Sequence, residues 1–443
     1  MEGAALRLPA VDVDQTLENF FNPMVDALEG IVFFAVPIGG AQLPILVVWL
    51  LGSAFAITLI VGFRPWRDLV HSIQIIRGHY NRYDDPGQVT SFQALATERD
   101  GLAQRGMPRL GKALAVAFSI FAMIGALGAG NVFQANQLAA QVVVATGGQD
   151  SVLAGLGWLI GIVVAAITGA VILGGITSIA NWTSRLTPLM GLLYLGCILV
   201  IFAVNFTSMP AAILAIFQGA FTGEGVKGGI IGVAIVGIQR ALFSNAAGVG
   251  TAAIAHSVTK TRRPAQEGFV AAWEPFIDSV VICTMTALAV IVTGQNVNLS
   301  GDGVAITTAV FATVNTAFTH LLTVCVVLFA FSTILSYSYY GMKATGYLFG
   351  DSRIAELVYN IFWLIMIVVG AAVSLNTVVR FSDAMFFLMA VPNLLGIFLL
   401  SKVLRHELVG HRHALREGRI EVVPEAERST MLNKPMKGVS MRS

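Results

Sequence analysis

The stretch that decides the fold is Arg240-Ala-Leu-Phe-Ser-Asn-Ala-Ala-Gly-Val-Gly-Thr-Ala-Ala-Ile-Ala-His256. It is apolar enough to lie in a bilayer, yet small and polar residues crowd its centre: Ser244, Asn245, Gly248, Gly250 and Thr251. Each glycine costs a helix interior roughly 0.8–1 kcal/mol relative to alanine. Backbone within a membrane unwinds only where protein or a water-filled cavity covers it. The stretch therefore predicts a membrane helix that breaks near Asn245 and offers its peptide dipoles to a solute or an ion.

The composition of the whole chain agrees with a membrane location. Of its 443 residues, 56% are hydrophobic and 12% are charged, whereas soluble domains carry about 25% charged residues. This deficit of charge predicts an all-α polytopic membrane protein. Cys197, Cys283 and Cys325 all lie in apolar tracts, so we expect buried thiols rather than disulfides or metal ligands. The motifs offer no convincing catalytic constellation, and we expect no enzyme and no organic cofactor.

Runs of about 20 apolar residues mark helices that cross a bilayer. We expect one transmembrane domain over 1–443, with an extracytoplasmic or interfacial lead at 1–40, a membrane region at 41–403 and a basic tail at 404–443. Shorter apolar tracts at 29–38 and 304–318 are expected to lie at the interface or to re-enter the membrane. Nine spans are expected in the membrane region, at 41–63, 111–133, 152–180, 186–206, 229–255, 268–294, 316–346, 354–376 and 383–403.

Lysine and arginine gather in alternate connections between these spans. The basic side holds the segment 64–112, Arg185, the segment 260–263, Arg353 and the tail, whereas the opposite side has little beyond Lys227 and Arg380. By the positive-inside rule the basic side is cytoplasmic. The N-terminus is then outside and the C-terminus inside, as an odd number of spans requires.

A second polar cluster is formed by Asn131, Gln134 and Gln137, which are spaced i, i+3 and i+6 and share one helix face. A primary amide is costly in an apolar environment unless it is hydrogen-bonded. The cluster predicts either a wet cavity or a bond network between helices.

Hydroxyl groups form a third cluster, with Ser332, Ser336 and Tyr340 at i, i+4 and i+8. Hydroxyl and carbonyl oxygens can ligate a hard cation such as sodium. Serine and threonine in membrane helices also commonly bond the carbonyl of the preceding turn. Both interpretations stay open.

Ionisable residues within spans are functional candidates. Glu274 and Asp278 flank Pro275 near the start of the sixth predicted span. They predict either a proton or sodium site, or an interfacial pair that caps a helix N-terminus. In the tail, His406, His411 and His413 predict either metal binding or, more simply, a charged helix that faces solvent or lipid headgroups.

Several motifs, in order along the chain, resemble the sodium:alanine (alanine/glycine:cation) symporter family. They include Phe21-Asn-Pro-Met-Val-Asp26, Ser91-Phe-Gln-Ala-Leu-Ala-Thr97, Gly130-Asn-Val-Phe-Gln-Ala-Asn-Gln137, Phe243-Ser-Asn245, Glu274-Pro-Phe-Ile-Asp278, Tyr339-Tyr-Gly-Met-Lys343 and Pro392-Asn-Leu-Leu-Gly396. The resemblance covers almost the whole chain. It implies sodium- or proton-coupled symport of small neutral amino acids, such as alanine or glycine, by an integral inner- or plasma-membrane protein.

The resemblance also implies a five-plus-five inverted-repeat fold with an extra N-terminal helix, in which each repeat opens with a broken helix. The family's first broken helix should follow Thr97, but this chain passes through Glu98-Arg-Asp100 to the lead into the third core helix. The first repeat is therefore expected to be incomplete, with about nine spans instead of eleven. Ala129, Ala246 and Tyr337 also depart from the family's usual glycine, glutamate and tryptophan.

Carried over residue by residue, the resemblance implies an amino-acid site and an ion site. The residues near the amino acid would be Gly130, Asn131, Gln134, Phe243, Asn245, Gly248, Gly250 and Tyr337. Ser332 and Thr333 would lie near a sodium ion, the coupling ion. Because one broken helix is missing, we expect transport by this form to be impaired.

Two other functions stay open on the sequence alone. One is a membrane binding or regulatory protein that keeps a degenerate amino-acid pocket, and the other is a deletion product without function. The preferred amino acid, the choice between sodium and proton coupling, and the oligomeric state are not determined by these motifs.

Overall fold

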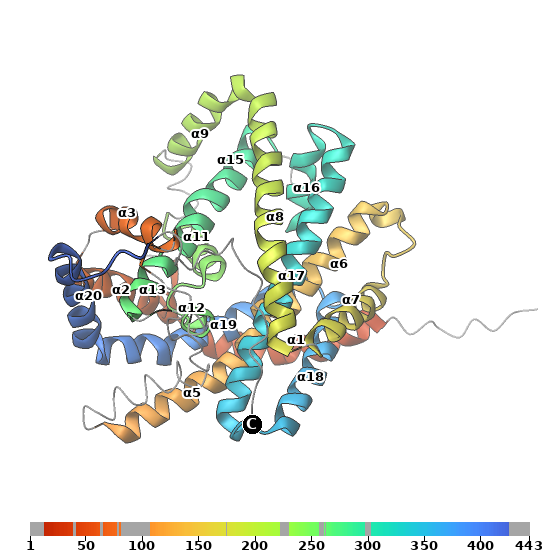
Figure 1. The fold of residues 1–443 in the computed structure, drawn as a ribbon. Coiled ribbons are helices and arrows are strands. Elements are labelled where there is room, and N and C mark those ends of the chain that lie inside the picture. The colour runs from red at the N-terminus through yellow and green to blue at the C-terminus, as the bar shows by residue number, and fades with distance from the viewer. Residues whose placement is uncertain are drawn as a thin grey trace, which may run out of the picture. The chain divides into compact units, whose positions relative to one another are not determined.

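The computed structural model describes residues 13–38, 41–62, 65–77, 79–80, 107–173, 175–221, 230–256, 261, 263–296 and 303–424. Nearly all of these residues are helical (Figure 1). The chain divides into two compact units, each described by itself. The first comprises Met1–Val47, Ser119–Phe243 and Val281–Met389, and the second comprises Val48–Phe118, Ser244–Val280 and Ala390–Ser443.

The first unit holds most of the long helices. Its elements are α1 (Val13–Val32), β1 (Ala35–Ile38), β2 (Ala41–Pro44), η1 (Gly128–Val132), α6 (Phe133–Ala145), η2 (Gly148–Asp150), α7 (Gly157–Ile172), α8 (Gly175–Val204), η3 (Phe206–Ser208), α9 (Met209–Phe221), α15 (Thr284–Val292), α16 (Val304–Ala312), α17 (Thr316–Phe349) and α18 (Arg353–Ala372). Within it, α7 packs along α18, and α8 packs along α17 (Figure 1).

The second unit is built from shorter helices. They are α3 (Pro65–Ile76), α12 (Thr251–His256), α13 (Pro264–Ala271), α14 (Trp273–Pro275) and α20 (Ser401–Arg416). Five elements contribute residues to both units: α2 (Ile45–Val61), α5 (Pro108–Leu127), α11 (Ile230–Asn245), η4 (Phe276–Cys283) and α19 (Leu375–Leu399).

The expectation of an all-α membrane protein is confirmed at this coarse level. Six helical segments in the described part of the chain are long and apolar enough to cross a bilayer: Pro108–Ala145, Arg185–Val204, Pro264–Val292, Thr316–Phe349, Arg353–Ala372 and Leu375–Leu399. Three shorter apolar helices are Ile45–Val61, Gly157–Ile172 and Phe206–Ala220. Of these, Phe206–Ala220 was not among the nine predicted spans.

Two predicted spans have different bounds. The tract 152–180 is not one helix, because α7 ends at Ile172 and α8 begins at Gly175, at a pair of glycines that lowers helix propensity. The tract 383–403 begins too late, because α19 starts at Leu375 and includes Arg380 and Asp383. These charges are tolerated in the helix because each has an ionic partner from another helix.

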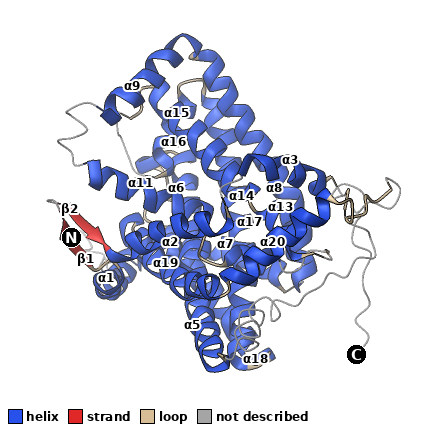
Figure 2. Ribbon diagram, turned by 90° about the vertical axis from the view of Figure 1, so that its left-hand side faces the viewer, coloured by secondary structure: helices blue, strands red, loops and turns tan. Residues whose placement is uncertain are grey.

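A short hairpin is the only sheet among the described residues (Figure 2). Strands β1 and β2 pair antiparallel, with Ala35 opposite Pro44 and Ile38 opposite Ala41. The sequence between them is Gly39-Gly40, which suits a two-residue hairpin connection. The apolar tract 29–38 is therefore the end of α1 and the first strand, and the tract 304–318 forms the short helix α16 and the start of α17.

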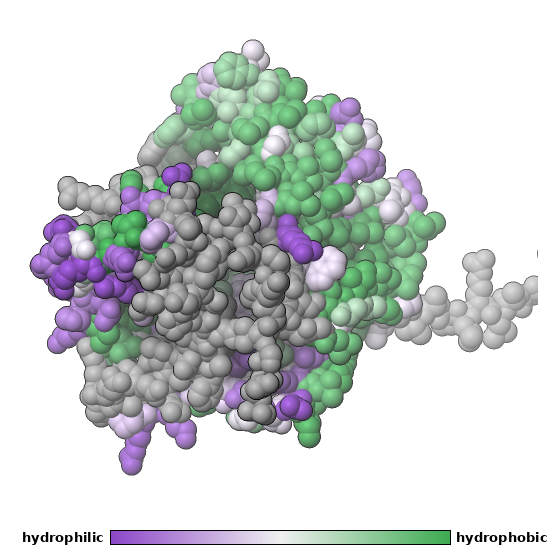
Figure 3. All heavy atoms as spheres, in the orientation of Figure 1, coloured by the Kyte–Doolittle hydropathy of each residue, from purple (hydrophilic) through white to green (hydrophobic). Residues whose placement is uncertain are grey.

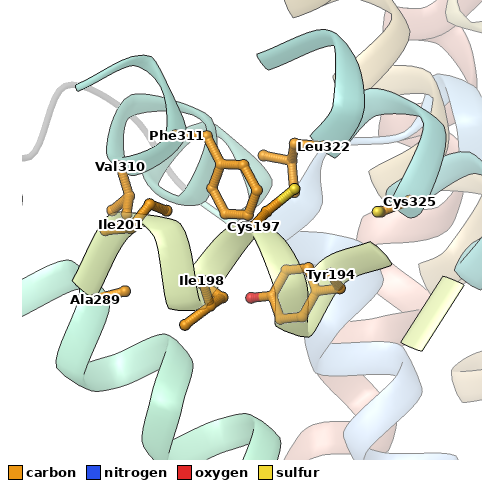
Figure 4. Packing of buried hydrophobic residues seen from close by; sticks show 9 residues of the cluster. All are labelled: Tyr194, Cys197, Ile198, Ile201, Ala289, Val310, Phe311, Leu322 and Cys325. Carbon is orange, nitrogen blue, oxygen red and sulfur yellow. The ribbon is translucent and has the colours of Figure 1, made fainter. Parts of the chain in front are cut away.

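One core of the first unit lies where α8, α15, α16 and α17 meet (Figure 4). Tyr194 stacks on Phe311 with ring centroids 5.8 Å apart, and its hydroxyl lies 2.7 Å from the Thr286 hydroxyl. Cys197 and Cys325 are buried here as expected, whereas Cys283 is exposed, which corrects that prediction. Lipid tails are as apolar as these side chains, so close packing is what holds the helices together.

Apolar residues also cover the outside of this unit, as the green surface over α8 shows (Figure 3). On α8, Leu192 is 74% exposed, and Leu189 and Leu199 are each 58% exposed. A large exposed apolar surface marks contact with a membrane or a partner. Such a surface is compatible with the six candidate spans found among the described residues.

Candidate functional site

The helix that contains Asn245 is interrupted, which confirms the central prediction from the sequence. Helix α11 ends at Asn245, and α12 begins at Thr251. Between them the backbone takes the left-handed region at Ala246 (φ +54°), Gly248 (φ +84°) and Gly250 (φ +94°). L residues avoid this region, so the two glycines supply most of the freedom that the break requires.

Side chains of the second unit fix the break in place. The Asn245 Oδ1 atom accepts a 2.8 Å bond from the Ala247 amide, a local turn that asparagine favours. The Asn245 Nδ2 atom donates to Ser279 Oγ at 3.0 Å. The Asn393 Nδ2 atom donates to the Gly248 carbonyl at 2.7 Å. The Asn245 side chain is thus committed to the break itself, and the Gly248 carbonyl already has one donor.

The carboxylates of Glu274 and Asp278 contact both arms of the broken helix. Asp278 Oδ2 accepts from the Ser244 hydroxyl at 2.5 Å, and Glu274 Oε1 lies 2.9 Å from His256 Nε2. The alternative of a cap at a helix N-terminus is wrong, because the helical segment starts at Pro264, well before both residues. The interpretation as a proton or sodium site stays a prediction.

His256, the last residue of α12, lies between two carboxylates. Its Nδ1 atom is 2.5 Å from Glu267 Oε1, and its Nε2 atom contacts Glu274. These two hydrogen bonds outweigh the effect of burial and raise the pKa of His256 to about 9. At neutral pH the imidazole is therefore charged, and both of its N–H groups donate.

In the first unit, the predicted glycine and aromatic residues lie against each other. Gly130 belongs to the π-helical segment η1, whose five residues are all buried. A Cβ atom on Gly130 would lie only 2.1 Å from Tyr337 Cγ. Single π-helical turns are often found at functional sites. Here the turn brings the backbone at Gly130 directly onto the Tyr337 ring.

The predicted amide face serves mainly as a bond network between helices. Asn131 is fully buried, and its Nδ2 atom donates to the Trp363 carbonyl of α18 at 2.8 Å. Gln137 Oε1 accepts from the Val304 amide at the start of α16 at 3.0 Å. Gln134 differs, because its Nε2 atom donates to the Ala129 carbonyl in η1 at 3.1 Å. Gln134 is half-buried, and the hydrogen bond of its side chain stays within its own helical segment.

Two further amides of α6 join this network, and sequence reasoning did not assign them. Asn136 donates to the carbonyls of Gly370 and Val373, at 3.2 and 2.7 Å. Gln141 bonds Thr323 at 2.8 Å and Thr308 at 2.9 Å. Their amide side chains in an apolar tract were the signal that could have identified them.

Phe243 lies in an aromatic cluster of the first unit. Its ring centroid is 5.3 Å from that of Phe133 and 5.4 Å from that of Phe386. The Arg240 guanidinium lies over the Phe243 ring, 5.4 Å from the centroid, and pairs with Asp383. The Arg240–Asp383 pair was missed because its members are 143 positions apart, although an acid within an apolar tract is itself a functional signal.

The predicted sodium residues donate to the preceding turn of their own helix. Ser332 Oγ donates to the Phe329 carbonyl at 3.1 Å, and Thr333 Oγ1 donates to the same carbonyl at 2.9 Å. Ser336 does likewise to the Ser332 carbonyl. This is the back-bonding that the sequence left as an alternative. A hydroxyl that donates its hydrogen keeps its oxygen lone pairs, so a role as a sodium ligand stays a prediction.

The histidines of the tail do not gather as a metal site within the described residues. His411 is buried in the second unit, with its Nε2 atom 2.9 Å from Nε2 of His71. The expectation that His411 faces solvent or headgroups is therefore wrong. The apolar side of α20 carries this histidine inward against α3, whereas His413 remains exposed.

The predicted site residues fall in both units. Asn245, Gly248 and Gly250 belong to the second unit, and the others belong to the first: Gly130, Asn131, Gln134, Phe243, Tyr337, Ser332 and Thr333. The contacts within each unit bring together Gly130 with Tyr337, and Asn245 with the backbone around Gly248. The predicted gap after Thr97 lies outside the described residues.

Comparison with known proteins gives one family. The model of the sodium:alanine symporter family matches residues 99–425. A sodium/alanine symporter of Methanococcus maripaludis is 36% identical over 332 residues, which cover 74% of this chain and 70% of that protein. An uncharacterized transporter of Haemophilus influenzae is 34% identical over 56% of this chain and 55% of its own length. A probable sodium/glutamine symporter of Bacillus subtilis is 30% identical over 59% of this chain and 55% of its own length. This chain thus spans only about half the length of the two bacterial relatives.

Proposed function

This chain belongs to the sodium:alanine symporter family, and we propose that it couples the movement of a small neutral amino acid, such as alanine or glycine, to a downhill flow of sodium ions. Relatives named as sodium-coupled carriers of alanine and glutamine support this proposal. The observation that carries it is the break between α11 and α12. Unwound backbone in a membrane exposes carbonyl and amide dipoles that can bind the charged ends of an amino acid.

We propose individual roles for the residues carried over from the family. Gly130, Asn131, Gln134, Asn245, Gly248 and Gly250 would offer polar groups or close backbone approach, and Phe243 and Tyr337 would cover the small side chain. Ser332 and Thr333 would contribute oxygen ligands to sodium. Gln134 is the amide best suited to change partners, since its bond to the Ala129 carbonyl is local and its side chain is half-buried.

The proposed fold is a five-plus-five inverted repeat with an extra N-terminal helix and an incomplete first repeat. The proposed domain is a single one over 1–443, in the bacterial inner or plasma membrane, with the N-terminus outside. Because the family pattern has two helices more after Thr97, we propose that this form transports slowly. The family match that begins at residue 99 supports a departure near this point.

Uptake by proteoliposomes tests the proposal. We expect slow accumulation of radiolabelled alanine under an inward sodium gradient, and none when choline replaces sodium. Asn245→Ala should abolish uptake, whereas Asn19→Ala, at an exposed position of α1, should not. A rapid, sodium-dependent rate would overturn the proposed impairment. No uptake and no alanine binding would overturn the proposed function itself.

One alternative is favoured by a particular observation. Asn131 and Gln137 are committed to contacts between helices, which leaves fewer free polar groups for a transported solute. A membrane binding or regulatory protein with a degenerate pocket would bind alanine without sodium-driven flux. Equilibrium binding measured beside uptake separates the two functions.

A further inference from the structure

One face of α1 is hydrogen-bonded to the N-terminal ends of two other helices. The Asp14 carboxylate accepts from the Gly157 and Trp158 amides at 3.2 and 3.4 Å, at the first turn of α7. The Glu18 carboxylate accepts from the Ser374 amide at 2.7 Å and from the Thr377 hydroxyl at 2.5 Å, at the first turn of α19. A carboxylate at a helix N-terminus satisfies free amides and complements the helix dipole.

The same face continues toward the end of α1. Arg380, on the second turn of α19, pairs with Asp26 and Glu29. Burial raises the pKa of Glu18, but the hydrogen bonds from Thr377 and Ser374 outweigh this effect and lower the pKa below its ordinary value. Glu18 therefore stays ionised at neutral pH. The polar face of α1 is occupied by the protein along its length.

The opposite face of α1 is apolar and exposed. Phe20, Met24 and Ile31 follow each other at i, i+4 and i+11, a spacing that aligns them in one stripe. Phe20 is 74% exposed, Met24 43% and Ile31 76%. Glu18, Asn22 and Glu29 fall on the other side of the helix, about half a turn away. A helix with one apolar stripe and one polar face is typical of a segment that lies in a membrane interface.

We propose that α1 lies along the bilayer surface, with Phe20, Met24 and Ile31 inserted among the lipids and its acidic face holding the starts of α7 and α19. The position of α1 supports the bilayer as the occupant of the stripe. It caps the first turn of α19, which is a candidate span, so α1 lies at the level where that span leaves the membrane. It also packs against α7, whose Val163 and Ile167 are each more than half exposed.

A second copy of this chain is the competing occupant. Stable protein interfaces bury roughly 800 Å² on each partner, which a stripe of three side chains does not supply. Lipid needs no such area, because each inserted side chain contributes independently to partitioning. The proposal does not depend on the transport function, since it rests on the contacts and exposure of α1.

Fluorescent labelling of single cysteines tests the proposal. The full chain with Cys283→Ser, which removes the exposed thiol, would carry a cysteine in place of Phe20, Met24 or Ile31, labelled with an environment-sensitive dye in phosphatidylcholine proteoliposomes. The matched control is Asn19→Cys, next to Phe20 in the chain and exposed. We expect blue-shifted emission, quenching by nitroxide-labelled lipid and protection from iodide at the three stripe positions, and the reverse at residue 19.

Two outcomes would overturn the proposal. Equal iodide quenching at residues 19, 20, 24 and 31 would place the stripe in water. Efficient cross-linking between copies through the three stripe cysteines, without lipid quenching, would make a second copy the occupant. Because all labelled side chains are exposed, loss of folding is not expected, and a monodisperse elution profile checks it.

Discussion

The π-helical segment around Gly130 and the broken helix around Gly250 begin from the same kind of sequence and end in different structures. Both place glycines and amides inside an apolar tract. At Gly130 the helix stays continuous and widens by one π turn, and the neighbouring amides bond other helices. In the second region the helix stops at Asn245, and three of the five residues up to Gly250 take positive φ. In the first region side chains bind helices together, and in the second they hold open backbone in place.

The two regions differ in the hydrogen-bond partners of their asparagines. Asn245 bonds the amide two residues ahead, which competes with the helical bond that this amide would otherwise make. Asn131 and Asn136 instead reach carbonyls on α18, which leaves their own helix intact. An asparagine that bonds its own backbone therefore accompanies the break, and asparagines that bond a neighbouring helix accompany the continuous π-helical turn.

The largest effect is expected from Gly250→Ala. A Cβ atom there would lie 2.5 Å from Phe118 Cε2, and the backbone has φ +94°. Overpacking and left-handed backbone together should lower the unfolding free energy by about 2–5 kcal/mol, measured by denaturant unfolding in detergent. Gly248→Ala is the matched control: its φ is +84°, but its Cβ atom would lie 3.5 Å from Leu394 Cδ2, an ordinary contact. It should therefore lose only the stability that the left-handed backbone costs. Unchanged stability of Gly250→Ala would contradict the description of the break.

The second-largest effect is expected from Gly130→Ala, and a second substitution at Tyr337 should reverse it. Gly130→Ala introduces a methyl group against the Tyr337 ring and should cost about 1–3 kcal/mol of unfolding free energy. Because Gly130 lies in a helix, removal of the whole Tyr337 side chain, Cβ included, in Gly130→Ala/Tyr337→Gly should recover most of that loss in a double-mutant cycle. The equivalent pair, Gly250→Ala/Phe118→Leu, should recover only part of the lost unfolding free energy, since residue 250 keeps its positive φ. Equal recovery of stability in both pairs would contradict the claim that backbone conformation distinguishes the break at Gly250 from the π-helical turn at Gly130.

A pH titration tests the contacts of His256, the last residue of α12, with Glu267 and Glu274. The pKa of His256 is raised to about 9 by Glu267 and Glu274, so its contribution to stability is fully present below the ordinary value near 6.5 and is lost as pH rises through about 9. We expect hydrogen exchange of residues 251–256, corrected for intrinsic rates, to accelerate above that pH by an amount that corresponds to about 1–2 kcal/mol. His256→Gln should show no such step, and the exposed His413→Gln should keep it. A step that persists in His256→Gln would assign the titration to another group.

The smallest effect concerns the buried amides. Asn136→Leu removes the hydrogen bonds to the Gly370 and Val373 carbonyls and one from Gln137, and it should cost about 1–2 kcal/mol. Asn131→Leu removes the bond to the Trp363 carbonyl and should cost about 1 kcal/mol. Alanine uptake should then fall only in proportion to the folded fraction if these amides are structural. A much larger loss of uptake in Asn131→Leu, at native stability, is the result that the proposed role of Asn131 near the amino acid requires.

The sequence was sufficient for the elements that depend on local pattern. Apolar runs identified most of the long helices, and the crowding of Ser244 to Thr251 identified the break. It was insufficient for pairings between distant segments, because Arg240 with Asp383, or His71 with His411, leaves no local trace. The bounds of α19 were misjudged for the same reason. The charge at Arg380 is typical of a loop unless its partners on α1 are known.

The pair formed by Arg240 and Asp383 has an electrical consequence. A single charge moved across a membrane gains or loses about 2.3 kcal/mol for every 100 mV of potential. Opposite charges held together cancel as they move, so a displacement of this pair carries no net current. The Arg240–Asp383 pair itself would then add nothing to any voltage sensitivity of the protein. A variant with only one of the two charges would acquire a gating current of its own.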